Sequence, residues 1–193
     1  QIHKYVSDKQ NLYNNILLFL ENTENDEETF KNLIDIINNQ QDEENHEKYY
    51  HLLHLLSRIA DNHHRFDTFF KIILHLQTQI KQTLSNSEIF SIFKDNKKML
   101  LFLIQNKIIA IDDNIFIELM NKIELNGCCY SHFFYPELKE FLEEEQSQAI
   151  KEELLLKDPN IFDNFEEKRL KGENNSYICS LIQEDSVEEF IAY

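Results

Sequence analysis

Glycine and proline are scarce in this 193-residue chain, where each occurs only twice. Glycine supplies the positive-φ positions of tight hairpin turns, so a chain with so little of it has few ways to build a sheet of hairpins. Apolar residues instead recur at the i, i+3, i+4 spacing of helices, and no stretch of useful length alternates like a strand. We therefore predict an all-α fold.

Four amphipathic segments, separated by short polar joints, account for the first 84 residues. We expect them to pack as an N-terminal helical bundle portion, residues 1–84, because each segment has one apolar face to bury. The residues of these faces are Leu12, Ile16, Leu17 and Leu20; Phe30, Leu33, Ile34 and Ile37; Tyr49, Leu52, Leu53, Leu56 and Ile59; and Phe66, Phe69, Phe70, Ile73, Leu76 and Ile80.

Shorter helices are expected from Ser85 onward. Ser85 and Glu88 fit the S-x-x-E capping box, which starts a helix by satisfying backbone N–H groups at its first turn. The segments that follow are 89–93, 99–104, 115–123, one from Pro136 through Leu142, and one that begins at Asp158 and Pro159. Short helices joined by tight polar turns are typical of a solenoid of helix pairs. We expect residues 85–172 to form such a helix-pair portion, an α-solenoid, with a single compact bundle as the alternative.

The charge balance limits the partners. The chain has 35 acidic and 19 basic residues, a formal net charge of -16. Such a field repels nucleic-acid phosphates and anionic lipid surfaces, and no apolar run reaches the roughly 18 residues of a membrane span. We expect no nucleic-acid partner, no membrane partner, and a protein partner that is basic.

The cellular setting is inferred from the cysteines and the first residues. Cys128, Cys129 and Cys179 form no even disulfide framework, and the opening Q-I-H-K-Y-V-S-D-K has no apolar signal core. We therefore expect a reducing, cytoplasmic location.

Two histidine-containing segments suggest a metal-dependent alternative. His51 and His54 are three residues apart on one expected helix, and C-C-Y-S-H, residues Cys128 to His132, combines thiol and imidazole groups. Zinc prefers such ligands, so a zinc enzyme or regulator is the alternative hypothesis. The H-E-x-x-H signature of zinc proteases is absent, however. A signature that begins at His46 and Glu47 requires histidine at position 50, and that residue is Tyr50. We expect these residues to be structural or exposed and the chain to have no cofactor; a helical lipid carrier is a third hypothesis.

The last residues, 173–193, have two apolar stripes and a second capping box, Ser186 with Glu189. This pattern predicts a short helical hairpin, and its segment E-D-S-V-E-E-F-I-A-Y resembles the first unit of an ankyrin array. The T-P-L-H tetrapeptide and the usual inter-helix glycine are both missing. The predicted repeat-stacking face consists of Ile178, Leu181, Ile182, Val187, Phe190 and Ile191.

The resemblance extends over the whole chain. Segments such as L-Y-N-N-I-L-L-F-L-E-N-T, L-L-F-L-I-Q-N-K-I-I and F-E-E-K-R-L-K-G-E-N-N-S-Y-I-C-S-L-I resemble the N-terminal helical region of protozoan ankyrin-repeat proteins that carry the ankyrin-type domain of unknown function. The resemblance implies downstream ankyrin repeats in the same chain, continuing past Tyr193, and supplies no catalytic residue.

A non-enzymatic interaction module that caps an ankyrin array is therefore the leading functional hypothesis. Large rigid aromatic side chains dominate interface energetics, which makes Tyr49, Tyr50, Tyr130 and Tyr135 candidate anchors for a partner. The alternative role for these tyrosines is core packing.

Overall fold

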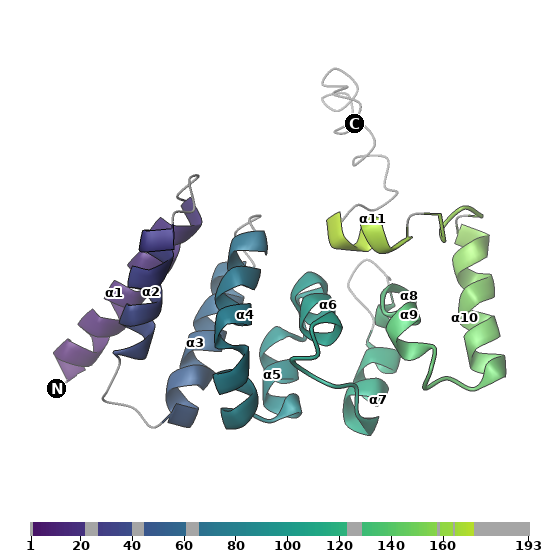
Figure 1. Cartoon of the computed structure of the whole chain (residues 1–193). Coiled ribbons are helices and arrows are strands. Elements are labelled where there is room, and N and C mark those ends of the chain that lie inside the picture. Colours follow the sequence, from purple (N-terminus) through teal and green to yellow (C-terminus); the bar gives the residue numbers. More distant parts are fainter. Residues whose placement is uncertain are drawn as a thin grey trace, which may run out of the picture. The chain divides into compact units, whose positions relative to one another are not determined.

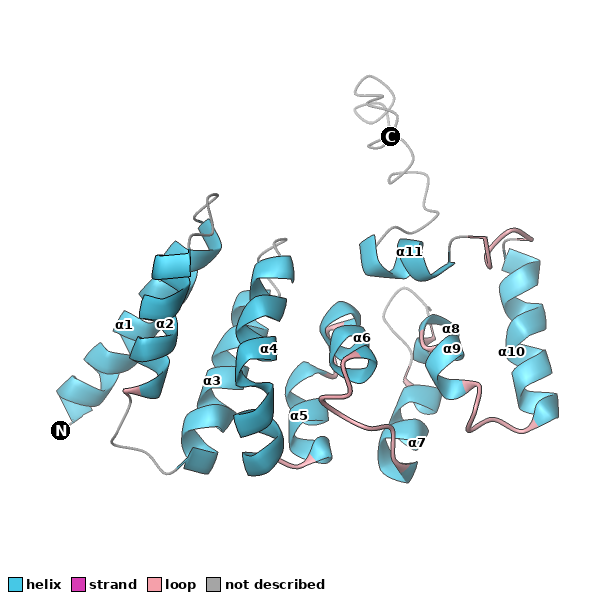
Figure 2. Ribbon diagram, in the orientation of Figure 1, coloured by secondary structure: helices cyan, strands magenta, loops and turns pink. Residues whose placement is uncertain are grey.

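The computed structural model describes residues 2–21, 27–39, 45–60, 66–122, 129–157, 159–163 and 165–171. Within these ranges the chain forms eleven helices and no strand, so the all-α prediction is confirmed (Figure 2). The chain divides into two compact units, residues 1–111 and 112–193.

The first unit contains three successive helix pairs. The pairs α1–α2, α3–α4 and α5–α6 each join helices that are neighbours in the chain and that pack against each other, and in the first two pairs the helices run in opposite directions (Figure 1). The helices are α1 (Ile2–Glu21), α2 (Glu27–Asn38), α3 (Asn45–Ala60), α4 (Phe66–Thr83), α5 (Asn86–Phe93) and α6 (Lys97–Gln105).

Contacts between the pairs join corresponding helices. The ring of Phe30 on α2 meets that of His75 on α4 at a centroid distance of 5.3 Å. Phe70 on α4 stacks on Phe102 of α6 at 3.8 Å. These contacts form a row of second helices, α2, α4 and α6, and stacked helix pairs of this kind are the building principle of an α-solenoid.

The first helices of the last two pairs are also in contact. The buried hydroxyl of Ser57 on α3 donates a hydrogen bond to the carbonyl of Ile92 on α5 at 3.0 Å. The pair arrangement continues into α5 and α6, and the two compact units meet after Ile111. The expected portions 1–84 and 85–172 stay a prediction.

The short helices α5 and α6 begin where small polar side chains cap them. Ser85 accepts a hydrogen bond from the backbone N–H of Glu88, and the Glu88 carboxylate accepts one in return from the backbone N–H of Ser85, so the predicted capping box is confirmed. Asn96 caps α6 in the same way through the N–H of Met99, at 3.1 Å. Each cap satisfies a first-turn donor that has no partner within its helix.

The second unit contains shorter helices around an aromatic centre. Among its described residues, Tyr130, Phe134, Leu119 and Leu138 are almost completely buried. A second cluster of Tyr135, Ile150 and Leu154 is flanked by the half-buried Met120, Leu142 and Ile161. The helices are α7 (Asp113–Asn121), α8 (Tyr130–Phe133), α9 (Tyr135–Leu138), α10 (Glu144–Lys157) and α11 (Phe165–Lys171).

Two expected helices of this unit differ from the observed ones. The helix that Pro136 begins ends at Leu138 rather than Leu142, because the chain turns there: the N–H of Phe141 donates to the carbonyl of Leu138 at 2.9 Å. Pro159 lies in a turn rather than in the first position of a helix, and α11 begins only at Phe165.

Candidate functional site

The two histidines of the metal hypothesis lie on the outside of α3. His51 and His54 are both exposed. The ring of Tyr50 meets that of His54 edge-on at 4.6 Å and that of His51 at 6.2 Å. Burial, and then the charges of His51 and Arg58, lower the pKa of His54. These rings therefore form an aromatic cluster on the surface of α3 with Tyr50 between the two imidazoles.

The Cys128 to His132 segment has a different arrangement. Cys128 lies outside the described residues, and the described thiol, that of Cys129, is half-buried. The imidazole of His132 is buried, and its Nε2 lies 2.9 Å from a carboxylate oxygen of Glu153 on α10. Among the described residues, no three His, Cys, Asp or Glu side chains are close enough to hold one metal ion.

The predicted repeat-stacking face cannot be compared with the structure. Its six residues lie outside the described residues, which end at Lys171. They are Ile178, Leu181, Ile182, Val187, Phe190 and Ile191.

The four candidate tyrosine anchors divide into core and surface residues. Tyr49, Tyr130 and Tyr135 are buried, and burial raises the pKa of Tyr49. Only Tyr50 is partly exposed. Three of the four therefore fill the interior of their own unit and present no side chain to a partner.

One side-chain hydrogen bond connects α3 to the cap of α5. Nε2 of His46 lies 2.8 Å from Oε1 of Glu88, whose other carboxylate oxygen accepts from the hydroxyl and the N–H of Ser85. The hydrogen bonds from Ser85, and then the one from His46, lower the pKa of Glu88 from 4.5 to about 2. The ionised form of Glu88 is thus the form that the fold prefers.

Replacing this carboxylate should give a pH-dependent loss of stability. We expect Glu88→Ala to lower the free energy of unfolding by about 1 kcal/mol at neutral pH, since it removes the capping box. The pKa of Glu88 is lower in the folded chain, so its contribution is complete above pH 4.5 and is lost as the pH falls towards about 2. Urea titrations of the two proteins across this range measure the difference.

Glu47→Ala is the control, because Glu47 is an exposed glutamate in the first turn of α3, as Glu88 is a first-turn glutamate of α5. It reports the effect of removing a first-turn charge without removing a capping box. A loss in Glu88→Ala that stays constant across the acidic range contradicts the role assigned to the carboxylate.

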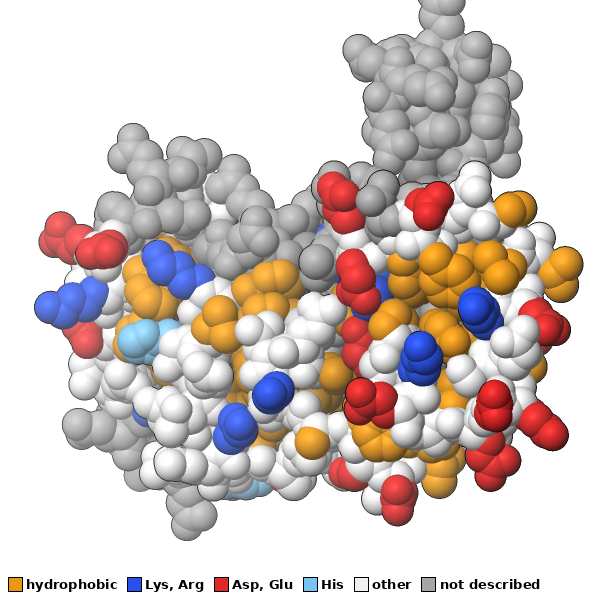
Figure 3. Space-filling model, turned by 45° about the vertical axis from the view of Figure 1, so that its right-hand side comes forward, with side chains coloured by type: hydrophobic (Ala, Val, Ile, Leu, Met, Phe, Trp, Pro, Cys, Tyr) orange, Lys and Arg blue, Asp and Glu red, His pale blue; other side chains and the backbone are white. Residues whose placement is uncertain are grey.

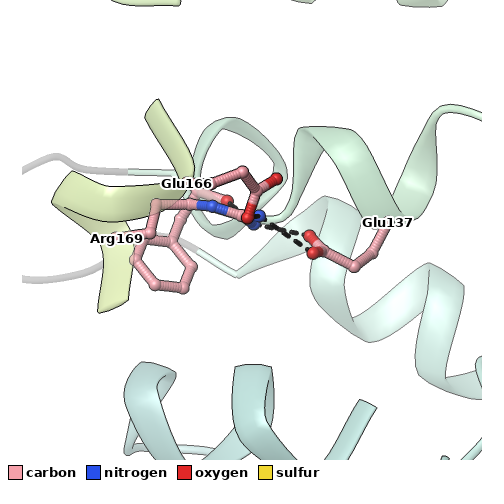
Figure 4. A network of polar contacts seen from close by, with 4 residues as sticks. Glu137, Glu166 and Arg169 are labelled. Atoms are coloured by element: carbon pink, nitrogen blue, oxygen red, sulfur yellow. Dashed lines mark hydrogen bonds and ion pairs between the residues drawn. The ribbon is translucent and has the colours of Figure 1, made fainter. Parts of the chain in front are cut away.

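A network of polar contacts surrounds Arg169 on α11 (Figure 4). Its guanidinium binds both carboxylate oxygens of Glu137 on α9, at 2.6 and 2.9 Å, and also binds Glu166. Nη1 donates a further hydrogen bond to the carbonyl of Phe133 at 2.8 Å. The carbon of the guanidinium also lies 5.6 Å from the ring centroid of Phe133 and 5.1 Å from that of Phe165. This contact, the Arg169 clamp, fastens α11 to α8 and α9.

The charge of Arg169 is maintained although only 3% of its side chain is exposed. Burial lowers its pKa, but the hydrogen bonds and charges of Glu137 and Glu166 raise it by more, so the net pKa is raised. Nε is buried and has no hydrogen-bond partner among the described residues. The clamp therefore depends on its carboxylates to offset the cost of burying a cation.

Acidic charge is concentrated in the second unit. Residues 1–111 contain 15 acidic and 12 basic residues, whereas residues 112–171 contain 15 acidic and 7 basic ones. Four large apolar side chains among the described residues of this unit are nevertheless exposed: Ile117, Phe141, Leu156 and Phe162. Figure 3 shows hydrophobic side chains among acidic ones on the right-hand side of the view, which belongs to this unit. Apolar side chains that stay exposed beside charges are typical of interaction surfaces.

Comparisons with known proteins supply no further identification: no family model, no curated protein and no solved structure matches the chain. The resemblance to ankyrin-repeat proteins therefore stays a prediction. In the part of the chain that the structure describes, no helix is both long and apolar enough to cross a membrane.

Proposed function

We propose that this chain is a non-enzymatic protein-interaction module whose partner is basic. The observation that carries this proposal is the second unit, where large apolar side chains are exposed among an excess of carboxylates. Apolar side chains supply most of the binding energy at an interface, and the surrounding charge selects partners of opposite sign and speeds their encounter.

The stacked helix pairs of the first unit support the proposal. Neighbouring pairs are in contact through α2 and α4, through α3 and α5, and through α4 and α6, as the helix pairs of a solenoid are. Proteins of this architecture commonly present such faces to other proteins. The resemblance to the N-terminal region of ankyrin-repeat proteins adds that the module caps an ankyrin array in the same chain.

The experiment for the proposed function is proximity labelling in source cells, followed by binding kinetics with the purified partner. We expect a reproducible protein partner of net positive charge whose association rate falls as the salt concentration rises, because screening weakens electrostatic steering. A neutral or acidic partner, or association that does not depend on salt, contradicts the proposal.

The position beside an ankyrin array has a separate test. We expect an antibody against this chain to detect a protein far larger than 23.2 kDa in immunoblots of source cells. A band near 23.2 kDa contradicts the ankyrin placement and leaves the interaction proposal to be decided by the labelling experiment.

A further inference from the structure

One surface of the second unit contains exposed aromatic and aliphatic side chains. They come from α7 and from the turn after α9. On α7, Ile115 and Leu119 point into the core, whereas Phe116 and Met120 are half-buried and Ile117 is 54% exposed. Phe141, in the turn after α9, is 49% exposed, and its ring lies 6.1 Å from that of Phe116. We call Phe116, Ile117, Met120 and Phe141 the α7 face.

The four side chains of the α7 face are continuous. At 100° per residue, Phe116, Met120 and Ile117 follow one another around a single side of α7, next to the buried stripe. Met120 packs against the inner cluster of Tyr135, Ile150 and Leu154. The α7 face is therefore continuous with the buried core, because Met120 belongs to the face and packs against core residues.

Four exposed carboxylates are close in sequence to the residues of the α7 face. Asp113 stands one turn before Ile117, and Glu118 directly follows it. In the turn after α9, Glu140 and Glu143 flank Phe141 and Leu142 in the sequence, and all four carboxylates are on exposed residues. An apolar centre with an acidic rim matches a ligand that has an apolar stripe between basic side chains.

We propose that the α7 face binds a basic amphipathic helix of a partner protein. This inference rests on the proposed interaction function and names its site and the chemistry of its ligand. The partner helix places apolar anchors at i, i+3 and i+4 over Phe116, Ile117 and Phe141, and its Lys and Arg side chains reach the rim. A helix fits this surface because the described residues contain no strand whose edge an extended peptide could join.

The test is selection from a display library of helical peptides with the complete chain as the target. We expect the selected peptides to carry net positive charge and one apolar stripe. Ile117→Ser and Phe141→Ser should each weaken binding of a selected synthetic peptide about tenfold or more, as truncation of an interface anchor does. Leu18→Ser is the matched control, since Leu18 is a similarly exposed leucine of the first unit, 62% exposed on α1, and should leave the affinity unchanged.

A charge variant keeps the test independent of any effect on packing. Glu118 and Glu140 are exposed, so Glu118→Lys with Glu140→Lys should leave the circular dichroism spectrum and the thermal midpoint unchanged. It should still weaken peptide binding several-fold, and the loss should shrink as the salt concentration rises. The α7 face is the wrong site if no peptide is selected, or if the selected peptides bind the apolar and the charge variants as well as they bind the original chain.

Failure of the inference can be distinguished from failure of the proposed function. If the partner found by proximity labelling binds all of these variants with unchanged affinity, the chain is an interaction module that uses another surface. If labelling finds no partner, the proposed function fails whatever the peptides do.

Discussion

Arg169→Ala should destabilise the second unit by about 3 kcal/mol, the effect expected when one member of a buried ion pair is removed. The substitution leaves the carboxylate of Glu137, which is only 12% exposed, without its cation. It also removes the hydrogen bond to the carbonyl of Phe133 and the contacts with the rings of Phe133 and Phe165. Urea titration measures the loss in the free energy of unfolding. Hydrogen exchange of the backbone amides of α8 and α9 then shows whether the loss occurs where the clamp acts.

Two further variants separate the parts of the Arg169 clamp. Arg169→Lys keeps the charge but cannot form the two parallel bonds to Glu137, so we expect a smaller loss of about 1 to 2 kcal/mol. Combining Arg169→Met with Glu137→Leu removes both charges and should be less destabilising than Arg169→Ala, because no unpaired carboxylate stays buried. A loss below about 1 kcal/mol in Arg169→Ala would mean that the pair behaves like an exposed salt bridge.

Tyr130→Ala should lower the free energy of unfolding of the second unit by about 3 to 5 kcal/mol, since it empties the space of a large buried ring. Tyr130 is 1% exposed, its ring lies 5.8 Å from that of Phe134, and the ammonium of Lys122 lies over it at 4.8 Å. Chemical denaturation monitored by circular dichroism measures the loss.

Tyr130→Phe and Tyr50→Ala are the controls for this substitution. Tyr130→Phe keeps the ring and its packing and removes only the hydroxyl group, so it should cost about 1 kcal/mol or less. Tyr50 is only half-buried, so Tyr50→Ala should cost at most about 1 kcal/mol. Similar losses at Tyr130 and Tyr50 would contradict the division of the tyrosines into core and surface residues.

Helix positions were predictable where the signal is local. The 3.6-residue periodicity located the first four helices, and the capping box at Ser85 and Glu88 marked the start of α5. Both signals depend on residues within a few positions of each other, so they can be recognised without knowledge of the tertiary structure.

Helix ends that depend on turns were predicted less well. Pro136 suggested a helix through Leu142, but the chain turns after Leu138. Lys107 follows α6 with φ 55°, a left-handed conformation that usually belongs to glycine, and its carbonyl accepts a hydrogen bond from Nζ of Lys81 at 3.0 Å. No local sequence pattern predicted this conformation of Lys107. It allows the chain to turn back after α6, where the next residue, Ile108, is buried and its N–H donates a hydrogen bond to the carbonyl of Leu103.

The candidate site was only partly predictable. Acidic composition led us to expect a basic partner, which stays a prediction. The α7 face did not stand out, because Ile117 and Phe141 look like ordinary core residues in the sequence. The Arg169 clamp was missed for the same reason: Arg169 and Glu137 are 32 positions apart. Burial and long-range pairing are properties of the packed chain, whereas the sequence shows only which side chains are available.

The sequence alone determined that this protein is helical, acidic and poor in tight turns, because periodicity and composition act through local geometry and long-range charge. Tertiary structure alone decided which aromatic residues are buried, which apolar residues stay exposed among carboxylates, and which arginine holds α11 in place. Each of these outcomes depends on segments far apart in the chain competing for the same interior volume, and that competition is settled only when the helices pack.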